Sequence, residues 1–270
     1  IAEVVRAGGC ALADIKGCGI GATGMVDMDS GEVVVSPNMP GLNRVNLLRE
    51  LSDFQFPVYV TNEMNTHMLG ERYFDPSLSE VGLMSVLWGY GIGVNVILHD
   101  SEIISGRREQ AWDIGHITFE KDGVPCHCGR RGCLEAYSAG WAVEIRVREA
   151  MGGEEAGVTV EAARKAMSDG DPITKPILRE AGETLGSALA PFVQFFAPDA
   201  LIIAGGVVRA DESVVDAIRA GLESKINLWE VGRIEIRASR LDKYVGALGA
   251  TKIVANHLLK APLLNILVSS

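Results

Sequence analysis

The sequence lacks long hydrophobic runs and has little positive charge. No uninterrupted apolar stretch among its 270 residues reaches the roughly 20 that a membrane-spanning helix needs, and Ile1 opens no recognisable signal peptide. We therefore expect a cytoplasmic protein that contains no membrane segment. Lys and Arg total 25 against 35 Asp and Glu, which gives a net charge of −10. An acidic chain of this kind is not expected to bind the phosphate backbone of a nucleic acid by itself.

The composition excludes wholesale disorder and predicts an α/β protein. Hydrophobic residues make up 47% of the chain and charged residues 22%, which is enough apolar material for a packed core. The length fits two modest domains or one large α/β unit. The 31 glycines follow no Gly-X-Y period, so we expect them in tight turns and ligand loops.

Strands come early in the predicted pattern, and helices alternate with strands later. Residues 16–23 and 31–35 are predicted to form a hairpin, and residues 83–88 and 93–98 a second hairpin around Gly89-Tyr90-Gly91. Apolar residues at helical spacing predict the later helices. This order favours a mixed sheet in two lobes around a cleft. The predicted helices are 1–11, 64–74, 141–150, 160–167, 173–196, 213–226 and 246–259, and the other predicted strands are 57–61, 201–204 and 234–238.

Three of the five cysteines, Cys126, Cys128 and Cys133, lie in one short loop. The total is odd, and Cys10 and Cys18 are far away in the sequence. This clustering indicates a metal site in a reducing compartment more than a disulfide framework. The three thiolates can converge only if the chain doubles back, which Gly129 and Gly132 permit. Three unliganded cysteines in a buried turn are the alternative.

Two histidines compete for the fourth position of a zinc site. His127 lies between Cys126 and Cys128, so its side chain is expected to point away from a metal that they share. His116 lies ten residues before Cys126 and could complete a Cys₃His tetrahedron. Four protein ligands leave no open position, so we expect a structural Zn²⁺ held by His116, Cys126, Cys128 and Cys133.

The residues around this loop resemble the signature of the ROK family, which contains bacterial sugar kinases and sugar-responsive transcriptional repressors built on one fold. The resemblance begins with Asp113-Ile114-Gly115-His116 and continues through Cys126-x-Cys128-Gly129-x-x-Gly132-Cys133-Leu134-Glu135. Further family motifs follow in the same order along nearly the whole chain: Ser36-Pro37-Asn38, Asn62-Glu63-x-Asn65, Gly89-x-Gly91-Ile92-Gly93, Ala204-Gly205-Gly206 and Val245-Gly246-Ala247-Leu248-Gly249-Ala250.

The resemblance implies a two-lobed, actin-like/ribonuclease H-like ATPase fold of the sugar kinase type, with mixed sheets and a cleft. We expect residues 1–62 plus 246–270 to form the smaller lobe, and residues 63–245 to form the larger lobe with the zinc loop at 116–133. It also implies homodimers or homotetramers, since family members commonly assemble in this way.

Amides and carboxylates that could bind a sugar hydroxyl precede and follow the zinc loop. The resemblance assigns sugar contacts to Asn62, Glu63, Asp113, His116 and Glu135, and we add Asn38 as a candidate. His116 would hold zinc through one ring nitrogen and a sugar hydroxyl through the other. The alternative for Asn62 and Glu63 is a helix cap, because a helical pattern follows them directly.

Two carboxylates depart from the pattern of ROK kinases. Glu63 stands where those kinases carry the catalytic Asp, and Asp113 stands where they carry Glu. A displacement of about 1 Å can lower a rate on the order of 100-fold, whereas binding tolerates such shifts through a bridging water. Glu63 would be the catalytic base only if the protein is a kinase.

Phosphate binding would require glycine-rich turns. The candidates are Gly89, Gly91, Gly93, Gly205 and Gly206. The bulky Tyr90 could obstruct a phosphate, and Gly205-Gly206 could equally turn a strand into a helix. The family's Asp-x-Gly-Gly-Thr turn does not occur, Asp14-Ile15-Lys16-Gly17 being the nearest string. The Gly19-Ile20-Gly21-Ala22-Thr23-Gly24 match is better explained by a strand and a turn than by a dinucleotide site, because a helix would have to follow and residues 25–31 are expected to be turn-like.

These observations favour the effector portion of a ROK-type repressor that binds a sugar or sugar phosphate. Its DNA-binding segment would precede Ile1. The second hypothesis is an ATP-dependent hexose kinase that uses Mg²⁺, and the third is a scaffold that keeps zinc and oligomerises without binding sugar.

Overall fold

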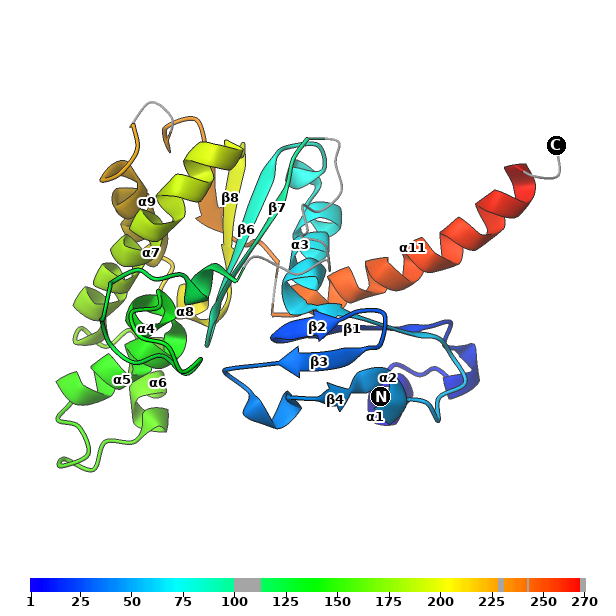
Figure 1. Ribbon diagram of the computed structural model, residues 1–270, viewed down its shortest axis with the longest axis horizontal. Helices are drawn as coiled ribbons and strands as arrows, with labels where there is room; N and C mark the ends of the chain where they lie inside the picture. The colour runs from blue at the N-terminus through cyan, green and yellow to red at the C-terminus, as the bar shows by residue number, and fades with distance from the viewer. Residues whose placement is uncertain (100–112, 228–230, 242, 268–270) are drawn as a thin grey trace. The chain divides into compact units, whose positions relative to one another are not determined.

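The computed structural model describes residues 1–99, 113–227, 231–241 and 243–267, with side chains to residue 259. Figure 1 shows its elements. The chain divides into two compact units, the first formed by residues 1–76 and 241–267 and the second by residues 77–240. The division proposed from the sequence, 1–62 plus 246–270 against 63–245, stays a prediction. Its portions at 100–112, 228–230, 242 and 268–270 lie outside the described residues.

The first unit contains two small sheets. Strands β1 and β5 pair in parallel, from Cys18 opposite Val58 to Ala22 opposite Asn62. Strands β2, β3 and β4 form an antiparallel sheet in that order. The elements of this unit are α1 (Ala2–Ala7), β1 (Cys18–Ala22), β2 (Met25–Asp27), β3 (Glu32–Val35), β4 (Val45–Asn46), α2 (Leu47–Glu50), β5 (Val58–Asn62), α3 (Glu63–Phe74) and α11 (Val245–Leu267).

The first predicted hairpin is wrong in its pairing. The partner of β3 is β2, with Val26 opposite Val33, in a stretch expected to be turn-like. Gly24 explains the difference, because its φ of +91° separates β1 from β2 and sends them into different sheets. Val26 is only 2% exposed and packs with Val33 and Val60 in the small core of this unit, so burial decides the local structure.

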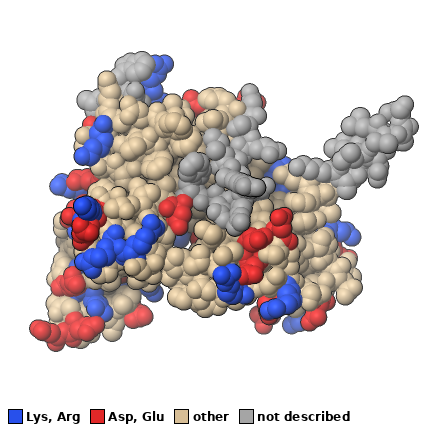
Figure 2. All heavy atoms as spheres, viewed as in Figure 1, with Lys and Arg blue, Asp and Glu red and all other residues tan. Residues whose placement is uncertain are grey.

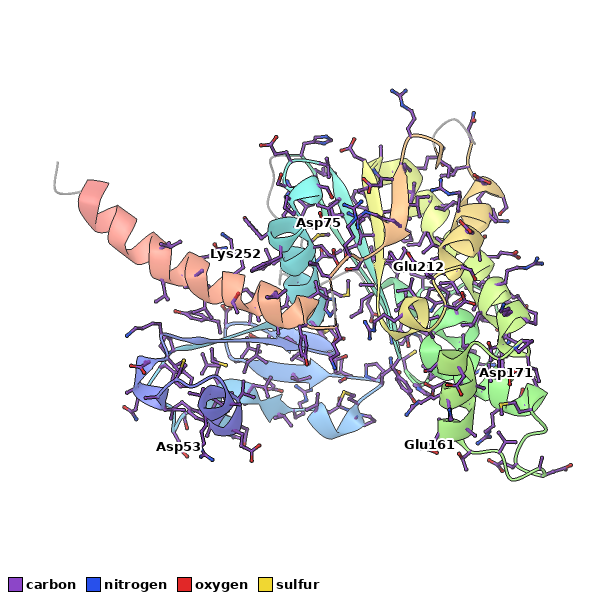
Figure 3. All side chains as sticks on the ribbon, turned by 180° about the vertical axis from the view of Figure 1, so that it is seen from behind. Asp53, Asp75, Glu161, Asp171, Glu212 and Lys252 are labelled. Atoms are coloured by element: carbon purple, nitrogen blue, oxygen red, sulfur yellow. The ribbon has the colours of Figure 1, made fainter. Side chains whose placement is uncertain are left out.

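Helices α3 and α11 lie against each other in close contact. A Cβ atom at Gly249 would come 1.7 Å from the carbonyl oxygen of Thr66, so the two backbones touch there. Farther along the same pair, Lys252 Nζ (Lys252 is labelled in Figure 3) lies 4.0 Å from the centre of the Tyr73 ring. Both helices also contact β1, and this packing fixes the start of α3 relative to the β1–β5 sheet.

The second unit is built on a four-stranded mixed sheet in the order β7-β6-β8-β9. The predicted second hairpin is confirmed, with Leu83 opposite Ile97 and Trp88 opposite Ile92. Strands β6, β8 and β9 run parallel. The elements are β6 (Leu83–Trp88), β7 (Ile92–Ile97), η4 (Ile114–His116), α4 (Glu135–Ser138), α5 (Gly140–Ala150), α6 (Val160–Asp169), α7 (Thr174–Phe196), β8 (Ala200–Ala204), α8 (Gly206–Ala210), α9 (Val214–Glu223) and β9 (Glu235–Ala238).

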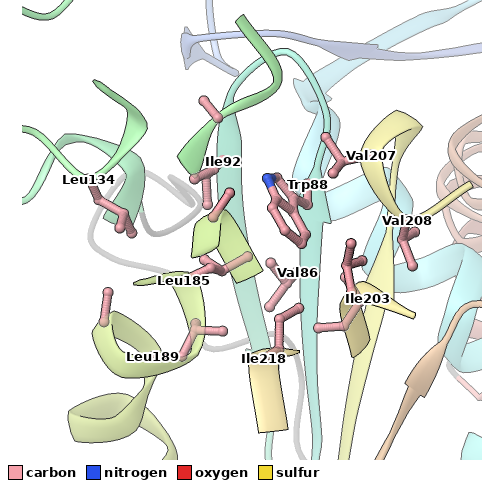
Figure 4. Packing of buried hydrophobic residues seen from close by; sticks show 14 of the residues in the cluster. Val86, Trp88, Ile92, Leu134, Leu185, Leu189, Ile203, Val207, Val208 and Ile218 are labelled. Carbon is pink, nitrogen blue, oxygen red and sulfur yellow. The ribbon is translucent and has the colours of Figure 1, made fainter. Parts of the chain in front are cut away.

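One face of this sheet forms the main core. Alternate residues of β6, among them Val86 and Trp88, point to the same side and pack with Leu185 and Leu189 of α7 and Ile218 of α9 (Figure 4). All five side chains are fully buried. At roughly 1.5–3 kcal/mol for each large apolar side chain removed from water, this layer holds the strand ends that carry the functional residues.

The carboxyl ends of β6 and β8 meet at one edge of the sheet. Because the two strands are parallel and Leu87 lies opposite Ala204, the turn after Trp88 and the turn at Gly205 are neighbours. Gly205 has a φ of +117°, and a Cβ there would lie 2.2 Å from the Trp88 carbonyl oxygen. The glycine therefore turns β8 into α8 while it touches the end of β6.

The surface charges are mixed. On the face shown in Figure 2, basic and acidic side chains are interspersed. Within the described part of the chain, no helix combines the length and the hydropathy that crossing a bilayer requires.

We predict that Gly249→Ala lowers the free energy of unfolding by about 1–3 kcal/mol, because the added methyl group overpacks the α3–α11 contact. Gly246→Ala is the matched control on the same helix. Its Cβ would meet side chains alone, the His67 ring at 3.1 Å and the Thr66 hydroxyl at 3.5 Å, so the helix preference for Ala should make it neutral or slightly stabilising. Chemical denaturation measures both, and equal effects would contradict the proposed backbone contact.

Candidate metal and sugar site

Four potential metal ligands converge in the second unit. The ligand atoms of His116, Cys126, Cys128 and Cys133 all lie within 4.8 Å of one another. His116 Nδ1 is 3.5 Å from Cys126 Sγ, and Cys128 Sγ is 3.6 Å from Cys133 Sγ. The structure thus brings together the four residues predicted to bind zinc, and zinc binding itself stays a prediction.

The His116–Cys126 and Cys128–Cys133 separations match those around a tetrahedral ion. Zn²⁺ binds sulfur at about 2.3 Å and imidazole nitrogen at about 2.0–2.1 Å, so tetrahedral ligands are roughly 3.5–3.8 Å apart. His116, Cys126 and Cys133 are buried, which suits a closed structural site. The donor set of three thiols and one imidazole is one that Zn²⁺ favours.

The loop doubles back as its glycines predict. Gly129 and Gly132 have φ values of +85° and +72°. Gly132 N donates to Val124 O at 2.8 Å, and Cys126 N donates to Arg130 O at 2.9 Å. A Cβ at Gly132 would also collide with the Glu120 carbonyl oxygen, at 1.6 Å. The backbone alone therefore brings the three sulfur atoms to one side of the loop.

Without a metal, the cysteine thiols of the loop differ in acidity. Burial is the largest influence and raises the pKa of Cys126 to about 12. At Cys128, burial also acts upward, but hydrogen bonds from the backbone and side chain of Arg130 outweigh it and lower the pKa to about 7. Because metal binding requires thiolates, the affinity of such a site falls as the pH falls.

Arg130 is a supporting residue that the sequence prediction missed. Its Nη2 donates to His116 O at 2.8 Å, and its guanidinium group also hydrogen-bonds Cys128. It therefore holds two of the four ligands in position. Its place within the Cys-Gly-x-x-Gly-Cys segment was the only feature of the sequence that could have indicated this role, because the contact with His116 depends on how the loop folds.

The second nitrogen of His116 faces a buried carboxylate. His116 Nε2 lies 3.9 Å from Glu135 Oε2, and Glu135 Oε1 accepts a hydrogen bond from Ile92 N at 2.8 Å. Glu135 is 2% exposed. It begins α4, two residues after Cys133, so the metal loop sets its position. This arrangement resembles the carboxylate partners that orient metal-bound histidines.

Asp113 lies close to His116. It immediately precedes η4, and its carbonyl oxygen accepts from His116 N at 3.2 Å. The residue is exposed as a whole, but crowding by protein atoms around the carboxyl group raises the pKa of Asp113. The neighbouring His116 side chain opposes this rise and the negative charge of Glu135 adds to it. The structure thus brings together three of the six predicted sugar-binding residues, Asp113, His116 and Glu135.

In the first unit, Asn62 and Glu63 lie at the junction of β5 and α3. Asn62 Oδ1 accepts from Met64 N at 2.8 Å, and its Nδ2 donates to Gly24 O at 2.6 Å. The interpretation of Asn62 as a helix cap is therefore confirmed. Its amide group still has one donor and one acceptor position to offer a ligand.

Glu63 is held by a residue that the sequence prediction missed. Burial raises the pKa of Glu63, and a hydrogen bond with the Thr23 hydroxyl lowers it in part. Thr23 precedes Gly24, where a Cβ atom would lie 2.8 Å from Ser36 Cα. Asn38, two residues after Ser36, is half-buried in the turn that follows β3. Nothing in the sequence links residue 23 to residue 63, because their contact depends on β1 and β5 pairing.

The predicted phosphate-binding glycines lie at the carboxyl ends of β6 and β8. Gly89 and Gly91 form the turn of the β6–β7 hairpin, and Gly93 lies within β7 opposite Leu87. Gly205 caps α8 and Gly206 begins it. Gly89 N donates to Gly91 O at 3.0 Å and Ile92 N is bonded to Glu135, so two amides of this segment already have internal partners.

A model of the ROK family matches residues 1–257. The chain is 32% identical to the glucokinase of Thermotoga maritima over 248 residues, covering 87% of this chain and 78% of that protein. It is 29% identical to the transcriptional dual regulator NagC of Escherichia coli and 26% identical to the xylose repressor of Bacillus subtilis. These matches cover 92% and 90% of this chain but 62% of either regulator.

Solved structures of both kinds are similar to this one. A ROK family glucokinase from Streptomyces griseus, in complex with glucose and AMPPNP, has a TM-score of 0.75 and 27% identity, covering 93% of this chain and 87% of that one. A ROK family transcriptional regulator, a homologue of the Escherichia coli MLC protein, has a TM-score of 0.71 and 25% identity, covering 86% and 60%. The expected fold class, α/β of the actin-like/ribonuclease H-like type with mixed sheets, is confirmed.

We predict that Arg130→Ala weakens metal binding by about 10- to 100-fold, the usual effect of removing a group that orients metal ligands. Cys128→Ser, which removes a ligand, should lose the metal. Arg131→Ala changes the neighbouring exposed residue and is expected to bind metal normally. Competition with a chromogenic chelator gives the affinities, and an unchanged affinity in Arg130→Ala would contradict the supporting role.

We predict that Glu63→Gln raises the melting temperature at pH 8, where the half-buried carboxylate is charged. Burial raises the folded-state pKa of Glu63 above its ordinary value of 4.5, so the wild-type protein loses stability as the pH rises from that value through the raised pKa. The difference between variant and wild type should therefore shrink as the pH falls towards about 4. A difference that is independent of pH would contradict this account.

Proposed function

Because this chain belongs to the ROK family, we propose that it is the sugar-sensing effector portion of a ROK-type transcriptional repressor with a structural Zn²⁺. Its relatives include proteins named N-acetylglucosamine repressor and xylose repressor, which supports a sugar or sugar phosphate as the ligand. The chain spans less than two thirds of the length of these repressors.

The observation that carries the proposal is the geometry of His116 and Glu135. Nδ1 of His116 faces the sulfur atoms, so a metal bound there would leave the hydrogen of a neutral imidazole on Nε2. It lies 3.9 Å from Glu135 Oε2, so one hydroxyl group can accept from Nε2–H and donate to Oε2 at the same time. A sugar hydroxyl is both donor and acceptor and suits this pair.

The metal has a structural role in this proposal. Four protein ligands leave Zn²⁺ no open position for substrate, so its contribution is to fix the loop. His116 is itself a ligand, and Glu135 follows Cys133 by two residues. Metal binding thus orients the two groups that receive the sugar hydroxyl, and Asp113 adds a third. The sugar contacts of Asn38, Asn62 and Glu63 stay predictions from the family resemblance.

Three features support a regulator over a kinase. Glu63 and Asp113 differ in length from the carboxylates expected of a ROK kinase, and displaced carboxylates harm catalysis more than binding. The Glu63 carboxyl group is also engaged by Thr23. Finally, the Tyr90 ring projects from the β6–β7 turn and is 45% exposed, where a phosphate-binding turn would carry a small residue.

An ATP-dependent hexose kinase is the second candidate. The contact between Gly205 and the end of β6 favours it, because this contact assembles two glycine-rich turns at the carboxyl ends of parallel strands, a common location for nucleotide binding. The relationship to a glucokinase supports it as well. In that case Glu63 would be the catalytic base, with ATP and Mg²⁺ as cosubstrate and cofactor, and Gly89, Gly91, Gly93, Gly205 and Gly206 would contact the nucleotide.

The proposal extends to the location and partners of the whole protein. A repressor of this kind acts in the cytoplasm. Its DNA contacts would come from a segment that precedes Ile1, since the present chain carries a net charge of −10. We also propose a homodimer or homotetramer, as is common in the family.

We predict that a hexose, pentose or N-acetylhexosamine, free or as its phosphate, raises the melting temperature of the metal-loaded protein by several degrees. Ligand at about 100 times its dissociation constant adds about 2.7 kcal/mol of stability. Glu135→Gln should weaken binding about 10- to 100-fold, because it removes a charge-assisted hydrogen bond. Glu161→Gln, on the exposed surface of α6, is the matched control.

An assay of ATP consumption by the metal-loaded protein distinguishes the two candidate functions. A regulator consumes no ATP when the stabilising sugar is added in a coupled assay. Turnover that depends on the sugar would establish the kinase instead, and a panel of sugars and nucleotides that leaves the melting temperature unchanged would favour a scaffold that binds neither.

A further inference from the structure

His127 lies in the metal loop without being one of the four clustered ligands, and its ring is packed against aromatic residues outside the loop. The His127 ring stacks on Trp141, with centroids 4.1 Å apart and an interplanar angle of 23°. It also lies nearly parallel to the Tyr90 ring, at 6.2 Å and 27°. Trp141 belongs to α5 and Tyr90 to the β6–β7 turn, so one histidine joins three segments.

The β6–β7 turn is hydrogen-bonded to the segment that carries Trp141. Gly140 N donates to Gly89 O at 2.9 Å, and Trp141 N donates to Tyr90 O at 3.4 Å. The backbone of the turn is thus attached to the first residues of α5. The Tyr90 side chain, which is 45% exposed, has the His127 ring as its stacking partner.

A second route joins the turn to the metal loop from the other side. Ile92 N, at the end of the turn, donates to Glu135 Oε1 at 2.8 Å, and Glu135 Oε2 faces His116 at 3.9 Å. The metal loop and the turn are therefore connected twice. One connection runs from the metal ligands through Glu135 to Ile92, and the other runs from Tyr90 to His127. Both routes begin at residues whose positions depend on how the loop is folded.

We propose that His127 is a positioning residue that couples the metal loop to the β6–β7 turn through its stack with Trp141 and Tyr90. When the metal orders the loop, the imidazole ring is held flat against Trp141 and Tyr90 is held with it. The ordered β6–β7 turn then holds the amide of Ile92 against Glu135. Metal occupancy, the conformation of the glycine turn and the placement of Glu135 are therefore linked.

The coupling gives the turn a role in effector sensing. It rests on the part of the proposed function that puts a metal in the loop and a sugar at Glu135. A ligand that contacts Glu135 would act on the turn through Ile92, and His127 would pass that change back to the metal loop. Thermodynamic linkage makes this coupling reciprocal. If metal binding favours the ordered turn by a given factor, then ordering the turn raises the metal affinity by the same factor.

Hydrogen exchange of the metal-loaded protein tests the coupling in one direction. His127→Ala should retain the metal by elemental analysis and yet show amide exchange about 2- to 10-fold faster in the peptide that spans residues 88–93, as expected from the loss of an aromatic pair. His127→Phe keeps a flat ring and should restore slow exchange. Arg131→Ala, an exposed change in the same loop, is the control. Unchanged exchange in His127→Ala would overturn the proposal.

The reciprocal variant tests it from outside the metal loop. Tyr90→Ala should lower metal affinity by about 2- to 10-fold in chelator competition, while Tyr90→Phe should not. This result decides the matter if His127→Ala loses its metal, and wild-type metal affinity in Tyr90→Ala would refute the coupling. Failure of the wild-type protein to hold any metal would instead defeat the proposed function, so the two failures are distinguishable.

Discussion

Convergence of three thiols and one imidazole within 4.8 Å is the constraint on which the rest of the site depends. Cys133 is followed directly by Leu134, which is fully buried in the main core, and then by Glu135. His116 is anchored by the Asp113 carbonyl and by Arg130. An ion at this point would fix both ends of the loop at once. It would thereby orient His116 and Glu135, and Glu135 is also held by the hydrogen bond from Ile92 N.

The same constraint explains which features could be predicted from the sequence. The metal cluster was predictable because its spacing and its glycines are local: Gly129 and Gly132 impose the reversal whatever surrounds them. The hairpin from Leu83 to Ile97 was predictable because two short apolar stretches flank the Gly89-Tyr90-Gly91 turn. Its pairing with β8, which brings Gly205 to Gly89, connects residues more than one hundred positions apart and has no local signal.

The features that escaped prediction depend on tertiary contact. Strand β2 lies in a stretch that was expected to be turn-like, and burial of Val26 against Val33 decides its structure. Thr23 reaches Glu63 only because β1 and β5 pair in parallel. His127 was correctly expected to point away from the metal, but its stack with Trp141 could not be foreseen. Helix capping by Asn62 was one of two readings that the sequence allowed, and the hydrogen bonds establish it.

Sugar recognition by this protein should depend on the bound metal. Isothermal titration of the stabilising sugar into metal-loaded and chelator-stripped protein measures that dependence. Circular dichroism must first establish that the stripped protein keeps its secondary structure. We expect removal of the metal to lower the sugar affinity by at least about 10-fold, since His116 and Glu135 lose their fixed orientation. Added Zn²⁺ should restore the affinity. Equal affinity in the folded, metal-free protein would show that sugar binding does not depend on the metal.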